Sequence, residues 1–148
     1  MRDGAEVRET YSAQQTWEAG RQMGLQAAAG QVTALTGDLG TGKTVFAQGF
    51  AAGLGISEAV NSPTFTILQV YEDGRLPLYH FDVYRIGDSE EMLEIGWEEY
   101  VYGNGVCLIE WAELIRDLID EIPKEKLQRV EILKDLSKGA DYRKIIFS

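Results

Sequence analysis

The chain has 148 residues, of which 45% are apolar and 26% are charged, and its 14 basic and 24 acidic side chains give a formal net charge of −10. This length and composition predict one globular domain over residues 1–148 and exclude intrinsic disorder, collagen and coiled coils. The acidic charge excludes general binding of nucleic acid, which depends on Lys and Arg to neutralise phosphates.

The first third of the chain predicts alternating strands and helices. Weak alternation before Ser12 indicates an edge strand, and Ser12 with Gln15 three residues later forms a capping box at a helix start. Gly30 ends that helix, and a short apolar run typical of a buried strand follows it. The predicted elements, in chain order, are a strand over residues 6–11, a helix over 13–29, a strand over 32–36 and a helix over 43–54.

The rest of the chain predicts further strands and short helices. Aromatic and branched residues stand on both sides of a turn at residues 72–74, which indicates a strand and its returning partner. An apolar run ends in Glu110, and the last two runs are expected to pair through a turn at Lys138 and Gly139. The predicted strands cover residues 65–71, 76–82, 106–110, 128–133 and 142–147, and the predicted helices cover 88–96 and 114–119.

The strongest motif follows the second predicted strand. Residues 37–44, Gly-Asp-Leu-Gly-Thr-Gly-Lys-Thr, match the phosphate-loop pattern G-x-x-x-x-G-K-[ST], with an apolar strand before and a helix after. In such a loop, backbone N–H groups and a helix N-terminus bind phosphate oxygens, Lys43 reaches the β- and γ-phosphates, and the Thr44 hydroxyl binds Mg²⁺. The alternative, a glycine-rich turn with a surface lysine, fits this context poorly. The residues expected to hold the nucleotide are Asp38, Leu39, Gly40, Thr41, Gly42, Lys43, Thr44 and Val45.

Two carboxylates stand at the ends of predicted strands. Asp82 closes the run Leu-Tyr-His-Phe, and Glu110 closes the run Val-Cys-Leu-Ile. Ligands of open α/β sheets lie beyond the carboxyl ends of strands, so both acids are expected to face the nucleotide. One would bind Mg²⁺ and the other would orient or deprotonate the attacking water, but the pattern does not say which. The alternative is that each is a solvated residue at a strand end.

A proline-containing segment, Ser62-Pro63-Thr64, lies between the nucleotide helix and the next predicted strand. In phosphate-loop switch proteins, a loop at this place is ordered by the γ-phosphate and Mg²⁺. Thr64 is therefore a candidate sensor of the γ-phosphate. The alternative is an ordinary proline turn that leads into a strand.

Taken together, the motifs resemble those of the TsaE family, small bacterial ATPases of tRNA threonylcarbamoyladenosine biosynthesis. The resemblance rests on residues 37–44, Ser-Pro-Thr-Phe at 62–65, His-Phe-Asp-Val-Tyr-Arg at 80–85 and Ile-Glu-Trp at 109–111. It implies an α/β phosphate-loop NTPase fold, with a mixed, mostly parallel sheet flanked by helices. It also implies hydrolysis of ATP with Mg²⁺ for a complex of the TsaB and TsaD proteins, which transfers threonylcarbamoyl to adenosine 37 of tRNA. The chain would then meet tRNA only through that complex.

The resemblance also implies roles for single residues, and the chain departs from the family pattern at two other positions. Many members have a second Thr where this chain has Val45, although the Val45 backbone N–H can still reach an α-phosphate. Many have Pro after the Glu-Trp pair, where this chain has Ala112. The implied roles are phosphate-binding lysine for Lys43, Mg²⁺ ligand for Thr44, Walker-B-like acid for Glu110, second catalytic acid for Asp82, switch residue for Thr64 and Glu-Trp residue for Trp111.

Several other residues carry less specific signals. His80, the only histidine, is expected to be a hydrogen-bonded structural residue rather than a base, and the single cysteine, Cys107, is expected in the core. Arg85 either pairs with Asp82 or a phosphate, or forms a structural ion pair. The acidic run over residues 88–99 is either a solvated face or a surface for a basic partner.

Two other functions stay open beside an ATPase: a small-molecule kinase and a non-catalytic module that senses nucleotide. A kinase needs arginines over a second phosphate, whereas residues 45–80 contain only Arg75 as a basic residue. Because few arginines stand near the motifs, hydrolysis is expected to be slow alone and faster with partners. A lone cysteine, with no membrane-length apolar stretch and no signal peptide, predicts a cytoplasmic protein without a membrane partner.

Overall fold

The computed structural model describes residues 6–37, 40–58, 60 and 67–148. Its strands are β1 (Glu6–Thr10), β2 (Val32–Thr36), β3 (Leu68–Tyr71), β4 (Leu78–Asp82), β5 (Val106–Glu110), β6 (Leu127–Lys134) and β7 (Arg143–Phe147). Its α-helices are α1 (Ala13–Gln26), α2 (Lys43–Gly53), α3 (Glu90–Ile95), α4 (Trp97–Val101) and α5 (Arg116–Asp120). Two short 3₁₀ helices are η1 (Ala112–Ile115) and η2 (Leu136–Lys138).

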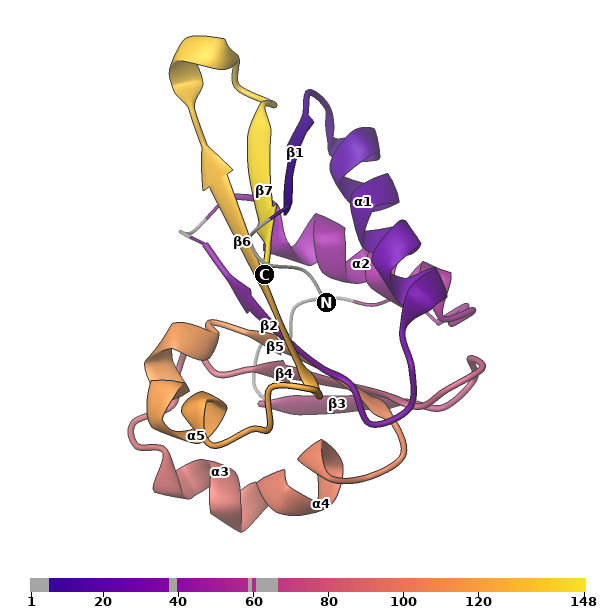
Figure 1. Ribbon diagram of the computed structural model, residues 1–148, viewed down its shortest axis with the longest axis vertical. Helices are drawn as coiled ribbons and strands as arrows, with labels where there is room; N and C mark the ends of the chain where they lie inside the picture. Colours follow the sequence, from indigo (N-terminus) through magenta and orange to yellow (C-terminus); the bar gives the residue numbers. More distant parts are fainter. Residues whose placement is uncertain (1–5, 38–39, 59, 61–66) are drawn as a thin grey trace.

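The strands form a 7-stranded sheet in the order β1-β7-β6-β2-β5-β4-β3 (Figure 1). The central strands β6, β2, β5 and β4 are parallel, whereas β1, β7 and β3 join antiparallel to their neighbours. This mixed sheet with a parallel centre, flanked by helices, confirms the predicted α/β fold class. Because β2 lies in the middle of the parallel strands, the loop that follows it has a strand end on either side.

Helices cover both faces of the sheet. Figure 1 shows α1 and α2 on one face and α3, α4 and α5 on the other. Each face buries its own apolar cluster, because the parallel strands turn apolar side chains to both sides. The first cluster includes Phe46, Phe50, Leu108, Val130, Ile132 and Ile145, and the second includes Phe81, Met92, Trp97, Ile109 and Ile115.

Glycines allow α1 and α2 to pack backbone against backbone. A Cβ on Gly49 would collide with the Trp17 carbonyl oxygen, and a Cβ on Gly24 would collide with the Phe50 carbonyl oxygen. Side chains at these positions would force the helices apart, since well-packed interiors have no room for added atoms. The helix that follows the phosphate loop is therefore held closely against α1.

The predicted cap of α1 is confirmed, but its predicted end is wrong. The Ser12 hydroxyl accepts a hydrogen bond from the Gln15 N–H at 3.1 Å, as an N-cap does. The helix ends at Gln26 rather than at residue 29. The Arg75 guanidinium donates to three carbonyls at that end, those of Gly24, Leu25 and Ala27, at 2.8 to 3.0 Å. A side chain about 50 residues away thus replaces the glycine cap that local sequence suggested.

The helices after β4 are shorter than predicted. The helix predicted over residues 88–96 begins at Glu90, and Gly96, with φ of 102°, separates it from α4, which was not predicted. The helix predicted over residues 114–119 is instead η1 followed directly by α5. None of the helices in the described part of the chain is long and apolar enough to cross a membrane.

The predicted strands agree with the observed ones to within three residues at either end; β1 ends at Thr10 rather than at residue 11, and β6 ends at Lys134 rather than at residue 133. The strand predicted from residue 76 begins at Leu78, after Pro77, which has no N–H for a strand ladder. The strand predicted from residue 65 is observed from Leu68, and residues 65–66 lie outside the described residues. The predicted pairing of the last two strands is confirmed by the antiparallel register of β6 and β7.

Candidate functional site

The phosphate-loop sequence connects β2 to α2, as predicted. Gly42 has φ of 96° and directly precedes Lys43, the first residue of α2. Gly37 has φ of 149°, and a Cβ on it would lie 2.6 Å from the Ile132 carbonyl oxygen. Both positions therefore require glycine, because an L side chain would be strained or would clash. The predicted nucleotide-binding residues Asp38 and Leu39 lie outside the described residues.

Lys43 follows the loop directly and contacts Trp111, the residue that comes after β5. Its ammonium donates to the Gly37 carbonyl oxygen and lies 3.5 Å from the centre of the Trp111 ring. Trp111 has a left-handed backbone, with φ of 63°, which is rare for a bulky residue. Its ring packs against Tyr84, with ring centres 4.7 Å apart. The fold thus brings together Lys43 and Trp111, which are far apart in sequence.

The two predicted acids lie side by side. Asp82 and Glu110 are opposite each other at the carboxyl ends of the parallel strands β4 and β5. The Tyr84 N–H donates to Asp82 Oδ1 at 3.0 Å. Glu110 is only 2% exposed, so it is not the solvated strand-end residue that the sequence allowed as an alternative.

A buried histidine holds Glu110. His80 is fully buried, and its Nε2 lies 2.6 Å from Glu110 Oε2. If Glu110 is ionised, its carboxylate accepts this bond and Nε2 is the donor. His80 Nδ1 has no hydrogen-bond partner among the described residues. The expectation that His80 is hydrogen-bonded is confirmed, and its partner is the candidate catalytic acid; that it does not act as a base stays a prediction.

The oxygen donors at this end of the sheet fit Mg²⁺. Thr44 lies in the first turn of α2, and Asp82 and Glu110 supply carboxylates from neighbouring strands. In the part of the chain that the structure describes, no three His, Cys, Asp or Glu side chains gather into a metal cage. Mg²⁺ does not need one, since it keeps water and is commonly held by one or two carboxylates with substrate phosphates.

The remaining predicted residues have varied outcomes. Ser62, Pro63 and Thr64 lie outside the described residues, so the predicted switch stays a prediction. Arg85 is exposed, and the ion pairs seen among the described residues do not include it. Cys107 is buried as expected, and burial raises the pKa of its thiol to about 12, so it is no nucleophile at neutral pH.

The sequence analysis missed the cations on the other side of the loop. Arg143, at the start of β7, donates from Nε to the Thr41 carbonyl oxygen at 2.7 Å. Lys134, at the end of β6, lies opposite Arg143, and its Nζ lies 3.3 Å from where a Cβ on Gly40 would stand. No local sequence signal marks either residue, because each reaches the loop only through the pairing of distant strands.

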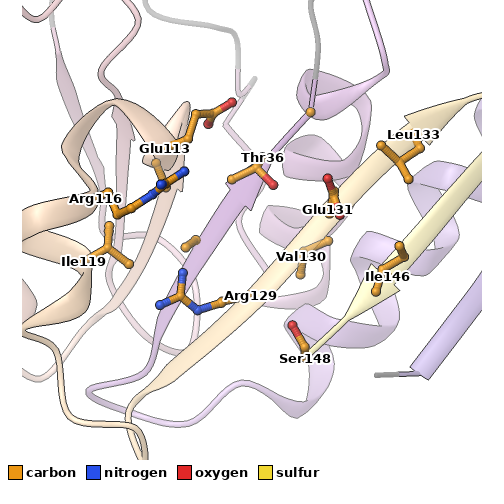
Figure 2. A pocket seen from close by; sticks show the side chains of 13 residues that line it. Thr36, Glu113, Arg116, Ile119, Arg129, Val130, Glu131, Leu133, Ile146 and Ser148 are labelled. Atoms are coloured by element: carbon orange, nitrogen blue, oxygen red, sulfur yellow. The ribbon is translucent and has the colours of Figure 1, made fainter. Parts of the chain in front are cut away.

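Two of the pockets lined by described residues border the loop. A small one of about 60 Å³ is lined by Thr41, Gly42, Val45 and Arg143, among others, on the α1 side. A larger one of about 430 Å³ lies between α5 and β6, where Arg116 and Arg129 point into it (Figure 2). The larger pocket meets the loop only near Gly37 and lies apart from the candidate catalytic groups.

The comparisons with known proteins agree on one family. The model of the family described as "Threonylcarbamoyl adenosine biosynthesis protein TsaE" matches residues 10–144. A TsaE protein of Bacillus subtilis is 54% identical over 119 residues, which cover 80% of this chain and 70% of that protein. A TsaE protein of Treponema pallidum is 50% identical over 110 residues, or 74% of this chain and 81% of that one. The crystal structure of YdiB from Bacillus subtilis superimposes with a TM-score of 0.79 and 40% identity, over 97% of this chain and 84% of YdiB.

Proposed function

Because this chain belongs to the TsaE family of threonylcarbamoyl adenosine biosynthesis proteins, we propose that it is an ATPase of tRNA modification. It binds ATP with Mg²⁺ and hydrolyses it to ADP and phosphate in the cytoplasm. Hydrolysis drives or resets the complex of TsaB and TsaD that transfers threonylcarbamoyl to tRNA. The chain meets tRNA only through these partners, in keeping with its net charge of −10.

The observation that carries the proposal is the meeting of three sequence motifs at one end of the sheet. The phosphate loop begins α2, Trp111 lies over the loop lysine, and Asp82 stands opposite Glu110. A loop for phosphates beside paired carboxylates is the arrangement that hydrolysis of a nucleoside triphosphate needs. The phosphate loop, Asp82 and the Glu110–Trp111 pair are at least 27 residues apart in the sequence, so local sequence alone does not bring them together.

In the proposed reaction, the phosphates lie against the loop N–H groups and the N-terminus of α2. Lys43 exchanges its contacts with Gly37 and Trp111 for phosphate oxygens. A water oxygen forms a bond to the γ-phosphorus while the bond to the β–γ bridging oxygen breaks, and ADP leaves. One of the two carboxylates, Asp82 or Glu110, orients this water and receives its proton.

The protein oxygens near the loop fit Mg²⁺, which when bound neutralises charge on the β- and γ-phosphate oxygens. Thr44, Asp82 and Glu110 are the residues that would hold it. Because His80 bonds to Glu110 Oε2, the other carboxylate oxygen, Oε1, can hold Mg²⁺ or orient the attacking water.

Partners are expected to accelerate the reaction. A free arginine over the γ-phosphate is worth about 10³–10⁵ in rate. Among the described residues near the site, Arg143 is bound to backbone carbonyls and Arg85 is exposed at the surface. The TsaB–TsaD pair would therefore supply positive charge or hold the Thr64 segment closed. By linkage, ATP must then raise the affinity for the partners by the same factor as the partners raise the affinity for ATP.

A kinase is disfavoured by the position of Arg75, which is the one basic residue between the loop and β4. Its guanidinium is bound to the end of α1 and does not form a lid. A module that only senses nucleotide differs from the proposed ATPase in its rate of hydrolysis.

The test is an ATPase assay of the full chain, alone and with the purified TsaB–TsaD pair. We expect slow release of phosphate by the chain alone and a clear rise with the pair. Nucleotide binding with no hydrolysis under either condition would support the sensing module. Fast hydrolysis that the pair leaves unchanged would contradict the proposed link to that complex.

A further inference from the structure

We propose that Arg143 is a positioning residue for the phosphates: it binds the outer carbonyls of the loop and thereby turns the loop N–H groups inward. The inference rests on the proposed nucleotide site and assigns a task to a strand that no motif includes. Arg143 does not touch the phosphates in this account, since it acts through the backbone of residues 40–42.

The contacts of Arg143 form a rigid bridge between β7 and the loop. Nη1 donates to the carbonyl oxygens of Ala140 at 2.8 Å and Tyr142 at 2.7 Å, which fixes the guanidinium on the segment that leads into β7. Nε donates to the Thr41 carbonyl oxygen at 2.7 Å, and Nη2 lies 3.5 Å from the Gly40 carbonyl oxygen. Because the guanidinium is planar, its anchored side fixes the direction of the side that faces the loop.

The geometry of the peptide bond transmits this contact to the ligand side of the loop. In a trans peptide, the C=O and the following N–H point in opposite directions. When the Thr41 carbonyl points out to Arg143, the Gly42 N–H points to the inner side. The Gly40 carbonyl and the Thr41 N–H are related in the same way, at longer range. Inward N–H groups of successive residues are what binds phosphate oxygens.

The loop needs such a clamp because its residues rotate easily. Gly40 has φ of 76° and Gly42 has φ of 96°, and without a Cβ these two residues restrict the adjoining peptide planes less than Thr41 between them does. Without Arg143, these planes have other orientations of similar energy, and ATP would have to select the correct one. Selection from several states lowers the apparent affinity by the fraction that is competent.

Positive charge alone is a competing explanation, and the chain allows the two to be separated. Lys134 already brings one ammonium close to Gly40. Replacing Arg143 by Lys keeps a charge on β7 but loses the planar fork with its fixed directions. The neighbouring Lys144 is exposed and pairs in register with Leu133, so its removal subtracts the same charge without touching the loop.

The test measures the dissociation constant of ATP with Mg²⁺ by calorimetry on the full chain, with thermal unfolding of the nucleotide-free protein as a check. We expect Arg143→Ala to raise the dissociation constant of ATP by about 10- to 100-fold, which corresponds to the loss of a hydrogen bond to a charged group. Arg143→Lys should recover less than half of that loss on a logarithmic scale, and Lys144→Ala should bind as wild type. Arg143→Ala should lower the midpoint of unfolding because it loses bonds to backbone carbonyls, but all three variants should stay fully folded at the temperature of the titration.

The outcomes separate this inference from the proposed function. Wild-type affinity of Arg143→Ala, in a series where Lys43→Ala no longer binds ATP, would overturn the positioning role and leave the nucleotide site standing. Wild-type affinity of Arg143→Lys would show that charge alone acts. An affinity loss seen only where a variant is partly unfolded at the temperature of the titration would show a merely structural role. If Arg143→Ala does not fold, the affinity of Arg143→Lys tests the positioning role, because this variant keeps the charge and most of the aliphatic side chain.

Discussion

The two strands beside β2 contribute to the phosphate loop in different ways. On the β5 side, Glu110 and Trp111 bring a carboxylate and an aromatic ring to the ligand side of the loop. On the β6 side, Lys134 and Arg143 bring positive charge to the backbone of the loop itself. The β5 side presents groups that can act on a reacting phosphate, whereas the β6 side presents groups that can hold the loop in shape.

This difference separates two tasks that a nucleotide site must perform. Interactions made equally with bound ATP and with the transition state strengthen binding without raising the rate at saturation. A clamp on the loop backbone belongs to this class. Carboxylates that orient water or metal act mainly in the transition state, so they raise the rate instead. The two flanks of the loop should therefore respond to mutation in different measurable quantities.

The largest expected effect comes from the residue that both tasks share. Lys43 begins α2 and contacts both Gly37 and Trp111. We expect Lys43→Ala to abolish measurable binding of ATP, because the β- and γ-phosphates lose their point-charge partner. Calorimetry with ATP and Mg²⁺ checks this result. Wild-type affinity in this variant would refute the assignment of the phosphate loop.

The next effect tests the β5 side. Glu110→Gln and Asp82→Asn should each slow hydrolysis at least about 100-fold, or about 2.7 kcal/mol of barrier, and leave ATP affinity closer to wild type than Lys43→Ala does. Single-turnover kinetics with phosphate detection measures the rate. A variant that hydrolyses ATP at the wild-type rate would show that its acid has no catalytic role.

A smaller effect on the rate of hydrolysis is expected at His80, which binds Glu110. His80→Phe removes the bond to Glu110 and keeps most of the aromatic volume, and His80 Nδ1 has no partner among the described residues to lose. We expect hydrolysis to fall about 10-fold, the usual cost of removing a partner that orients a ligand or catalytic group. ATP affinity should change little, and His80→Gln should recover part of the rate because its amide can donate. Full activity of His80→Phe would mean that Glu110 needs no support.

The smallest effect on activity is expected at Arg75, which lies on neither the β5 side nor the β6 side of the loop. Arg75→Ala removes the donor to the Gly24, Leu25 and Ala27 carbonyls and should lower the free energy of unfolding by about 1–2 kcal/mol. Hydrolysis at saturating ATP should be unchanged. Denaturant unfolding and the phosphate assay measure the two quantities. A loss of phosphoryl transfer with unchanged stability would revive the kinase alternative, in which Arg75 covers a phosphate.

The sequence predicted where the residues on the β5 side lie in the fold, because its signals are local, while their roles stay predictions. The phosphate loop is a contiguous motif, and Asp82 and Glu110 each close an apolar run that reads as a buried strand. Parallel strands end at the same edge of a sheet, so the meeting of the two acids followed from general rules. The bond between His80 and Glu110 and the contact of Trp111 with Lys43 depend instead on how the strands and the loop are placed in space.

The β6 side could not be predicted, for a physical reason. Arg143 lies 102 residues after Thr41, and the two meet only because β7 pairs with β6 and β6 pairs with β2. The same limit explains the wrong end of α1, which depends on Arg75 from a distant turn. Side chains that cap backbone carbonyls leave no periodic pattern, so neither contact has a signature in the local sequence.

The most direct test of two separate flanks is one experiment on two conservative variants, Glu110→Gln and Arg143→Lys. Calorimetry gives the dissociation constant of ATP, and single-turnover kinetics at saturating ATP gives the rate of hydrolysis. We predict that Glu110→Gln loses rate and keeps affinity, and that Arg143→Lys loses affinity and keeps its rate at saturation. If both variants lose the same quantity, the two flanks do not have separate tasks, and the account is wrong.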